Sequence, residues 1–110
     1  MAKYLIQASL TVEGLKGLIK EGGTKRREAV EAAVMGLGGT MEAFYYAFGD
    51  DDVFVIVDYP DNVTATAASL VGNAAGTSTV TVTVLLTPEE VDQATDLAKE
   101  KLAAYRPPGE

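Results

Sequence analysis

The side chains able to do chemistry here are carboxylates, amines, guanidinium groups, amides and phenols, because the 110 residues include no histidine and no cysteine. The absence of histidine removes the commonest general base and the commonest metal ligand. The absence of cysteine removes thiolate nucleophiles, thiolate metal sites and disulfide bonds. Proton transfer would depend on Asp, Glu, Lys or Tyr, or on an external group. We predict neither a metal site nor a cofactor.

A cationic cluster stands where a helix is expected to start, in the run Gly22-Gly23-Thr24-Lys25-Arg26-Arg27. Free backbone N–H groups and cations at a helix start can hold a phosphate or a carboxylate. The spacing does not fit a Walker loop, because no GK[ST] follows the glycines. Thr24, Arg26 and Arg27 are therefore our candidate anion-binding residues. The alternative is a basic helix face that pairs with nearby acidic side chains.

Three consecutive acids, Asp50-Asp51-Asp52, follow Gly49 in an expected turn. Carboxylate oxygens are the ligands that hard cations prefer. Adjacent residues on a tight turn point in different directions, however, and do not enclose an ion. The sequence therefore favours a solvated acidic turn over a cation site.

The elements that must position these side chains follow the order β-α-β-β-α-β-α. Short runs rich in strand formers predict strands over Lys3–Ser9, Thr40–Phe48, Asp52–Tyr59 and Thr77–Leu86. Gly49-Asp50 suits a tight hairpin turn, because glycine accepts positive φ without penalty. The first six elements match the ferredoxin-like βαββαβ arrangement, in which the first and third strands are central.

The helices are predicted from caps and apolar spacing. Thr11 starts the first helix, Gly22-Gly23 breaks it, and Thr24 is expected to cap its continuation. Asp61 follows Pro60 at the start of the next helix, and Thr87-Pro88-Glu89-Glu90 is a strong start for the last. The apolar stripes expected to face the sheet are Val12, Leu15 and Ile19; Val30, Ala33, Val34 and Leu37; Val63, Ala67, Leu70 and Ala74; and Val91, Ala94, Ala98, Leu102 and Tyr105. The tail from Arg106 is expected to be extended.

Alternation along the strands sorts the side chains between the two sides of the sheet. A short turn places Phe44 and Tyr46 on one side with Val53, Val55 and Val57. We expect this set to lie away from the helices, together with residues that include Leu5, Gln7, Glu42 and the threonines of the fourth strand. Such an apolar surface is rarely left exposed by a monomer, which predicts a subunit interface there. A small-molecule pocket lined by Gln7, Glu42 and Tyr46 is the alternative, and the two are compatible.

Length and charge limit the partners. A chain of 110 residues predicts one domain spanning residues 1–110. The net charge of −7 repels nucleic-acid phosphates and anionic lipids, so neither is expected as a partner. No signal peptide or membrane span is evident, and we expect the cytoplasm as the compartment.

The chain resembles the GYD-domain family of small bacterial proteins. The resemblance is carried by KYLIQASLTVEGLKGLIKEGGTKRREAV, AFGDDDVFVIVDYPDN, TVLLTPEEVD and the terminal YRPPG. Gly49 and Asp52 match the family signature, whereas Asp51 stands where its tyrosine is expected. The resemblance implies a ferredoxin-like α+β domain of the dimeric α+β barrel type, whose sheets pack face to face between subunits. It implies no activity.

Three functions remain open at this level. The first is a homo-oligomeric small-ligand-binding or accessory protein, which the lack of catalytic spacing favours. The second is a cofactor-independent, oxygenase-like enzyme acting on a small aromatic substrate, with Tyr46 and Glu42 assisting proton transfer. The third is a purely structural assembly domain.

Overall fold

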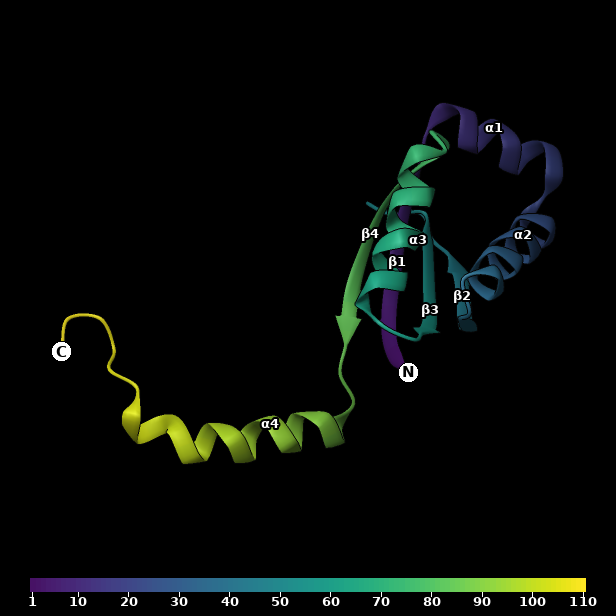
Figure 1. Ribbon diagram of the computed structural model, residues 1–110. Coiled ribbons are helices and arrows are strands. Elements are labelled where there is room, and N and C mark those ends of the chain that lie inside the picture. Colours follow the sequence, from purple (N-terminus) through teal and green to yellow (C-terminus); the bar gives the residue numbers. More distant parts are fainter.

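The computed structural model describes residues 1–110 as an α+β domain with one four-stranded antiparallel sheet (Figure 1). The strand order is β2-β3-β1-β4, so the predicted central and edge strands are confirmed. The strands are β1 (Ala2–Leu10), β2 (Thr40–Tyr46), β3 (Val53–Tyr59) and β4 (Ser78–Leu85). The helices are α1 (Val12–Glu21), α2 (Gly23–Gly36), α3 (Asn62–Ala74), α4 (Pro88–Lys101) and the 3₁₀ turn η1 (Leu102–Ala104). None of these helices is long and apolar enough to cross a bilayer.

The core lies between the sheet and helices α2 and α3. α2 packs on β2, and α3 packs on β4. Tyr4 faces Val57 across β1 and β3, and both side chains are almost fully buried. Val34 of α2 and Ala65 of α3 close over them. Only 8 of the 110 residues are buried, which is a small core for a chain of this length.

Glycine at position 22 separates α1 from α2. Gly22 has a φ of 86°, which L side chains rarely adopt, and its N–H donates to the Leu18 carbonyl. Because the next helix begins at once at Gly23, Gly22 is also the N-cap of α2 and makes no side-chain capping bond. The expected cap at Thr24 is therefore wrong. The caps at Thr11, Asp61 and Thr87 are confirmed.

The β2–β3 connection is a four-residue loop and not the expected two-residue turn. The Ala47 N–H donates to the Asp52 carbonyl at 2.9 Å, so residues 48–51 form the loop. Gly49 has no positive φ in it. The predicted sharing of a face by Phe44, Tyr46 and the three valines is nevertheless confirmed, because both loop lengths give the same register.

The side of the sheet on which that set lies was predicted wrongly. Val53, Val55 and Val57 pair with Ala8, Ile6 and Tyr4, and they face the helices. The reason is the register of β3 on β1, which runs without a shift and puts the valines beside the buried Tyr4. A β-bulge between Met41 and Ala43 separately changes the alternation within β2. Glu42 lies with Lys3 on the side away from the helices. The extra residue reverses the alternation, so that Glu42 lies on the side opposite to Phe44 and Tyr46, which share the helix side with the valines that they pair with.

We call the uncovered side of the sheet the open sheet face. Its apolar members are Leu5, Ala43, Tyr45, Phe54 and Ile56. The predicted threonines of β4 lie on it too, since Thr79, Thr81 and Thr83 pair with Ser9, Gln7 and Leu5. The predicted apolar surface is therefore present, with different aromatic and branched side chains on it.

Two of the predicted helix stripes point outward. On α1 the exposed fractions are 66% for Val12 and 84% for Ile19, and on α3 they are 79% for Val63 and 66% for Leu70. On the sheet side of these two helices, small residues make the contact in place of the larger apolar side chains. Gly72 approaches Val80 so closely that a Cβ on it would lie 2.8 Å from a Val80 methyl. The stripe predicted on α2 is confirmed, with Val34 buried and Val30 and Leu37 packed beside it.

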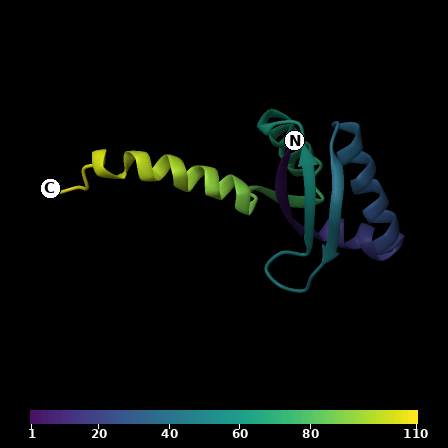
Figure 2. The same cartoon turned by 90° about the horizontal axis from the view of Figure 1, so that it is seen from below.

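α4 extends away from the rest of the molecule as an arm (Figures 1 and 2). Its only substantial contact is with η1, and no residue of it is buried. The radius of gyration is 17.8 Å, against about 13 Å for a compact chain of this length. The predicted apolar stripe of α4 therefore has no partner within the chain.

Candidate functional site

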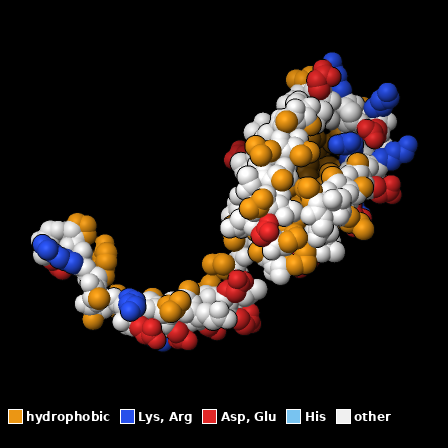
Figure 3. Space-filling view, viewed as in Figure 1, with side chains coloured by type: hydrophobic (Ala, Val, Ile, Leu, Met, Phe, Trp, Pro, Cys, Tyr) orange, Lys and Arg blue, Asp and Glu red, His pale blue; other side chains and the backbone are white.

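A groove runs along the helix side of the sheet, between α1 and α2 on one flank and α3 on the other. It has two compartments that share Arg26, Val30 and Val53 in their linings. The first has a volume of ≈ 190 Å³ and lies under α1 and α2, and the second has ≈ 230 Å³ and lies between α2 and α3. Figure 3 shows the hollow, with hydrophobic side chains inside it. We call this feature the helix-side groove.

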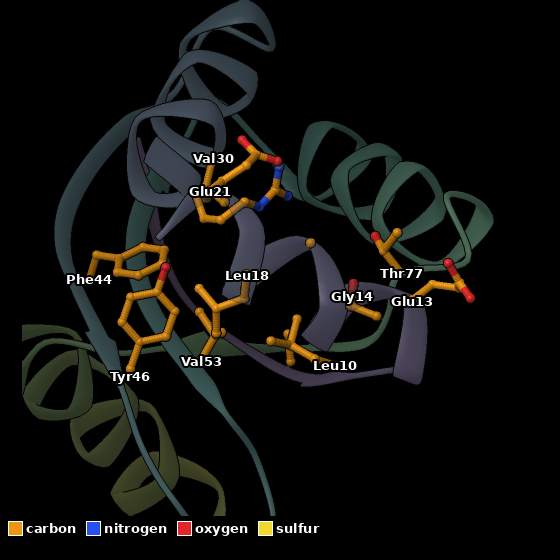
Figure 4. Close-up of a pocket in the computed structure, with 14 residues that line it drawn as sticks. Leu10, Glu13, Gly14, Leu18, Glu21, Val30, Phe44, Tyr46, Val53 and Thr77 are labelled. Atoms are coloured by element: carbon orange, nitrogen blue, oxygen red, sulfur yellow. The ribbon is translucent and has the colours of Figure 1, made fainter. Parts of the chain in front are cut away.

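Phe44 and Tyr46 of β2 form one wall of the first compartment (Figure 4). Their rings lie 5.0 Å apart, edge to face at 73°. This is a favourable arrangement, because the positive edge of one ring meets the negative face of the other. Both rings point into the groove because they lie opposite Val55 and Val53, which face the helices. Leu18 of α1 and Val53 of β3 complete the apolar surface.

The phenol of Tyr46 connects β2 to the junction between α1 and α2. Its hydroxyl donates a hydrogen bond of 2.9 Å to the Gly23 carbonyl. A Cβ at Gly23 would lie 3.1 Å from the ring, so a glycine there permits the close approach. Burial raises the pKa of Tyr46, and the positive charge of Arg26 partly opposes this effect. Tyr46 is therefore a neutral hydrogen-bonding group at neutral pH.

Arg26 supplies the positive charge of the groove. Its guanidinium group lies 3.8 Å from the Glu21 carboxylate, and 41% of its side chain is exposed. At that exposure the ion pair is weak, since surface pairs contribute about 0–1 kcal/mol. An incoming carboxylate could therefore replace Glu21 as the partner of Arg26 at little cost.

The other two predicted anion-binding residues lie outside the groove. Thr24 is exposed and lines neither compartment. Arg27 pairs with Glu31 at 3.6 Å along the helix, as the alternative of a self-paired basic face predicts. Of the three residues predicted to bind an anion, only Arg26 places a cationic group at a cavity.

The three predicted ligand-binding residues are divided between the two sides of the sheet. Gln7 lies on the open sheet face, where its amide donates to Asp51 at 3.1 Å. Glu42 pairs with Lys3 on the same face, whereas Tyr46 faces the groove. Glu42 and Tyr46 therefore cannot act together on one substrate. A binding role for each residue separately stays a prediction.

A charged cluster lies at one end of the open sheet face. Lys3 binds the carboxylates of Glu42 and Asp58, the latter at 3.2 Å. Hydrogen bonding to Glu42, and then to Asp58, raises the pKa of Lys3. The arrangement fixes the ammonium group within the sheet and leaves no free acid or base there.

The acidic loop is bonded to β1, in contrast to the solvated turn that the sequence favoured. Asp51 accepts hydrogen bonds from Gln7 and from the Ser9 hydroxyl, the second at 2.8 Å. Asp52 accepts one from the Leu10 N–H at 2.8 Å. Only the carboxylate of Asp50 is left to the solvent. The loop closes the sheet edge and does not form an ion site, since no group of three or more acids converges on a point.

Leu18 and Glu21 were missed by sequence reasoning as groove residues. The apolar stripe Val12, Leu15 and Ile19 drew attention to the opposite side of α1. The signal that was available is Gly14, followed at helical spacing by Leu18 and Glu21. A Cβ at Gly14 would lie 2.0 Å from the Thr77 carbonyl oxygen, so this side of α1 must contact backbone.

One comparison with known proteins gives a match. The family model described as the GYD domain matches residues 4–95. The matched segment covers the sheet except for the first two residues of β1, the groove and the first half of the α4 arm. No curated protein and no solved structure matches the chain.

Proposed function

The chain belongs to the GYD domain family, and we propose from its structure that it is a homo-oligomeric protein that binds a small aromatic carboxylate in the helix-side groove. The observation that carries the proposal is the pairing of an apolar compartment with a single weakly engaged cation, Arg26. Membership of the family by itself indicates no ligand.

The size of the first compartment supports a ligand with one ring. Apolar cavities of about 150 Å³ accommodate benzene. The compartment has ≈ 190 Å³, which leaves room for one substituent. Phe44 and Tyr46 offer a ring edge and a ring face for stacking.

One group, Arg26, supports a carboxylate on that ligand, although Glu13 and Glu21 also line the compartment. Guanidinium groups bind carboxylates through two parallel hydrogen bonds, about twice as strong as neutral ones. Tyr46 adds a neutral hydroxyl close to Arg26, as the effect of Arg26 on the Tyr46 pKa indicates. A neutral amide of the same shape would lose the charge and one of the two acceptor oxygens that Arg26 can bind, and should therefore bind much more weakly.

The surface area of the chain supports assembly. The chain exposes 7659 Å², whereas a monomeric protein of its mass exposes about 5800 Å². The excess of roughly 1900 Å² is within the range of about 1000–2500 Å² that each subunit buries in an obligate dimer. The apolar open sheet face, with Tyr45 69% exposed, supplies one surface for the contact.

Ligand binding is tested by thermal unfolding with benzoate and with benzamide. Benzoate should raise the melting temperature of the wild type by mass action, and benzamide should not. The shift should vanish in Arg26→Gln and persist in Arg27→Gln, a matched control whose arginine lines neither compartment. Equal shifts with both compounds, or a shift kept in Arg26→Gln, would refute the proposal.

The open sheet face as an interface is tested by sedimentation velocity at micromolar concentration. Ile56→Glu places a charge on that face and should reduce the mass of the assembly. Val84→Glu is the control, because Val84 lies in the same sheet on the helix side and is 52% exposed. An unchanged mass in Ile56→Glu would exclude this face as a contact.

A further inference from the structure

We propose that the ligand of the helix-side groove is a branched arylalkanoic acid, whose ring occupies the first compartment and whose alkyl arm occupies the second. This inference rests on the proposed function and adds the class of ligand to it. Its basis is that the one cationic residue of the groove lies where two apolar spaces meet.

The second compartment exists because α2 and α3 stand apart over the sheet. Helix α2 packs on the edge strand β2 and α3 on the other edge strand, β4, while the two helices make few contacts with each other. Gly72 holds α3 close to β4, since a Cβ there would lie 2.8 Å from a Val80 methyl. The central strands β1 and β3 therefore form the floor of the compartment, through Ile6 and Val55 among others.

The lining of the second compartment suits an alkyl group. Thirteen of its 17 lining residues are hydrophobic, and its helix walls carry the small side chains of Ala33, Ala68 and Ala75. Val71 lines it and is nevertheless 62% exposed, so apolar surface is left uncovered there. Covering that surface with an apolar group is favourable. The volume of ≈ 230 Å³ exceeds the roughly 150 Å³ that holds a benzene ring, so an arm of about four carbons has room.

The charges fix the place of the carboxylate. Arg26 lines both compartments and is the only Lys or Arg residue in either lining. Thr77 and Ser78, which also line both, carry no charge. Glu13 and Glu21 line the first compartment and not the second. A carboxylate is therefore stabilised at the junction beside Arg26, and not at the far end of either compartment.

These three positions define the shape of the ligand. The ring lies against Phe44 and Tyr46 in the first compartment (Figure 4). A linear acid with this ring and a carboxylate at Arg26 leaves the second compartment empty. A linear acid long enough to span both would carry its carboxylate past Arg26 into apolar surroundings, where a buried charge without a partner is costly. An acid whose ring and alkyl arm both branch from the carbon next to the carboxylate satisfies all three positions.

The inference is tested by calorimetric titration with two isomers. 2-Phenylhexanoate and 6-phenylhexanoate contain the same atoms and carry the same charge, but only the first is branched beside the carboxylate. Phenylacetate keeps the ring and the carboxylate and lacks the arm. We expect 2-phenylhexanoate to bind about tenfold or more tightly than phenylacetate, because half-burial of four extra carbons suffices for that gain. It should also bind more tightly than 6-phenylhexanoate.

Leucine substitutions in the wall test where the arm lies. Ala33→Leu places a larger side chain at the second compartment, and Ala32→Leu is the matched control, since Ala32 is the adjacent exposed residue of α2 and lines neither compartment. Ala33→Leu should bind phenylacetate as the wild type does and lose the gain with 2-phenylhexanoate. Ala68→Leu, in the α3 wall, should act in the same way and covers the case in which the new side chain on α2 turns outward. Circular dichroism of each variant confirms that it is folded.

Three outcomes would overturn the inference. They are equal affinities for the two isomers, a gain that survives in both Ala33→Leu and Ala68→Leu, and a fall in the mass of the assembly in both variants, which would show that a second copy fills the compartment. If phenylacetate binds through Arg26 and the isomers bind equally, this inference alone fails. If none of the three acids binds to the wild type, the proposed function fails with it.

Discussion

Asp52 forms a clamp between the acidic loop and the end of β1. Its carboxylate accepts the Leu10 N–H at 2.8 Å, and its own N–H donates to the Ala8 carbonyl at 2.8 Å. The side chain thus extends the pairing of β1 by one more bond, beyond its last pairing with β3 at Ala8.

Asp52→Ala would leave the half-buried Leu10 N–H without its acceptor. Hydrogen bonds to charged groups contribute about 1.5–3 kcal/mol. At about 4 °C per kcal/mol for a chain of this length, the melting temperature should fall by about 6–12 °C. Asp52→Asn keeps an acceptor oxygen without the charge, so we expect it to lose about half as much.

The assay is urea unfolding followed by circular dichroism and tyrosine fluorescence. All variants are compared at one protein concentration, since assembly would make the midpoint concentration-dependent. Asp50→Ala is the matched control, because it removes a neighbouring acid whose carboxylate is exposed, and it should change the free energy by less than about 0.5 kcal/mol. The reasoning is refuted if Asp52→Ala and Asp50→Ala have the same midpoint.

Three further perturbations test other parts of the fold. Gly14→Ala places a Cβ 2.0 Å from a carbonyl oxygen and should lower the free energy of unfolding in urea by about 1–3 kcal/mol. In Gly17→Ala the new Cβ meets no atom within 4 Å, so this variant should stabilise α1 by about 0.5–1 kcal/mol. Equal effects of the two substitutions would contradict the packing of α1. Asn73→Ala frees the N–H and the carbonyl of Val80, both held by the Asn73 amide, and should lower the melting temperature and increase light scattering on heating, because an edge strand is opened. Asp61 has a lowered pKa because it accepts the N–H at the start of α3, so its contribution is present above its unfolded pKa and is lost as the pH falls through its folded pKa. Asp61→Asn should remove that part of the acid sensitivity, and an identical pH profile of the unfolding midpoint would show that the carboxylate has no such role.

The fold was predictable because its signals are local. Helix starts at Thr11, Asp61 and Thr87 follow from side chains that bond the backbone within the next three residues. The hairpin register depends on the midpoint of the turn. A two-residue loop and a four-residue loop have the same midpoint here and therefore give the same strand pairing. These features require no knowledge of what packs on the sheet.

The side of the sheet was not predictable from the hairpin alone, because it is set by the pairing of β3 with β1, which lies far away in the sequence. A bulge at Glu42 carries no distinctive sequence signature, so simple alternation grouped Glu42 with Phe44 and Tyr46, from which the structure separates it. On α1 the apolar stripe was assigned inward by hydrophobicity, while close packing selected glycine for that side. The candidate site was predictable only in part. Arg26 was named from its charge, but the cavity beside it depends on the side to which β2 turns its aromatic rings and on the side of α1 that packs inward.

The bulge in β2 has a consequence for redesign of this strand. Residues 40–42 and residues 43–46 alternate between the two sides of the sheet in opposite phase, so the strand has to be designed as two short segments and not as one. A combinatorial library that varies every second position through Glu42, Phe44 and Tyr46 would alter both sides of the sheet at once. Randomising Ala43 and Tyr45 with Glu42 would instead change the open sheet face and leave the groove wall as it is.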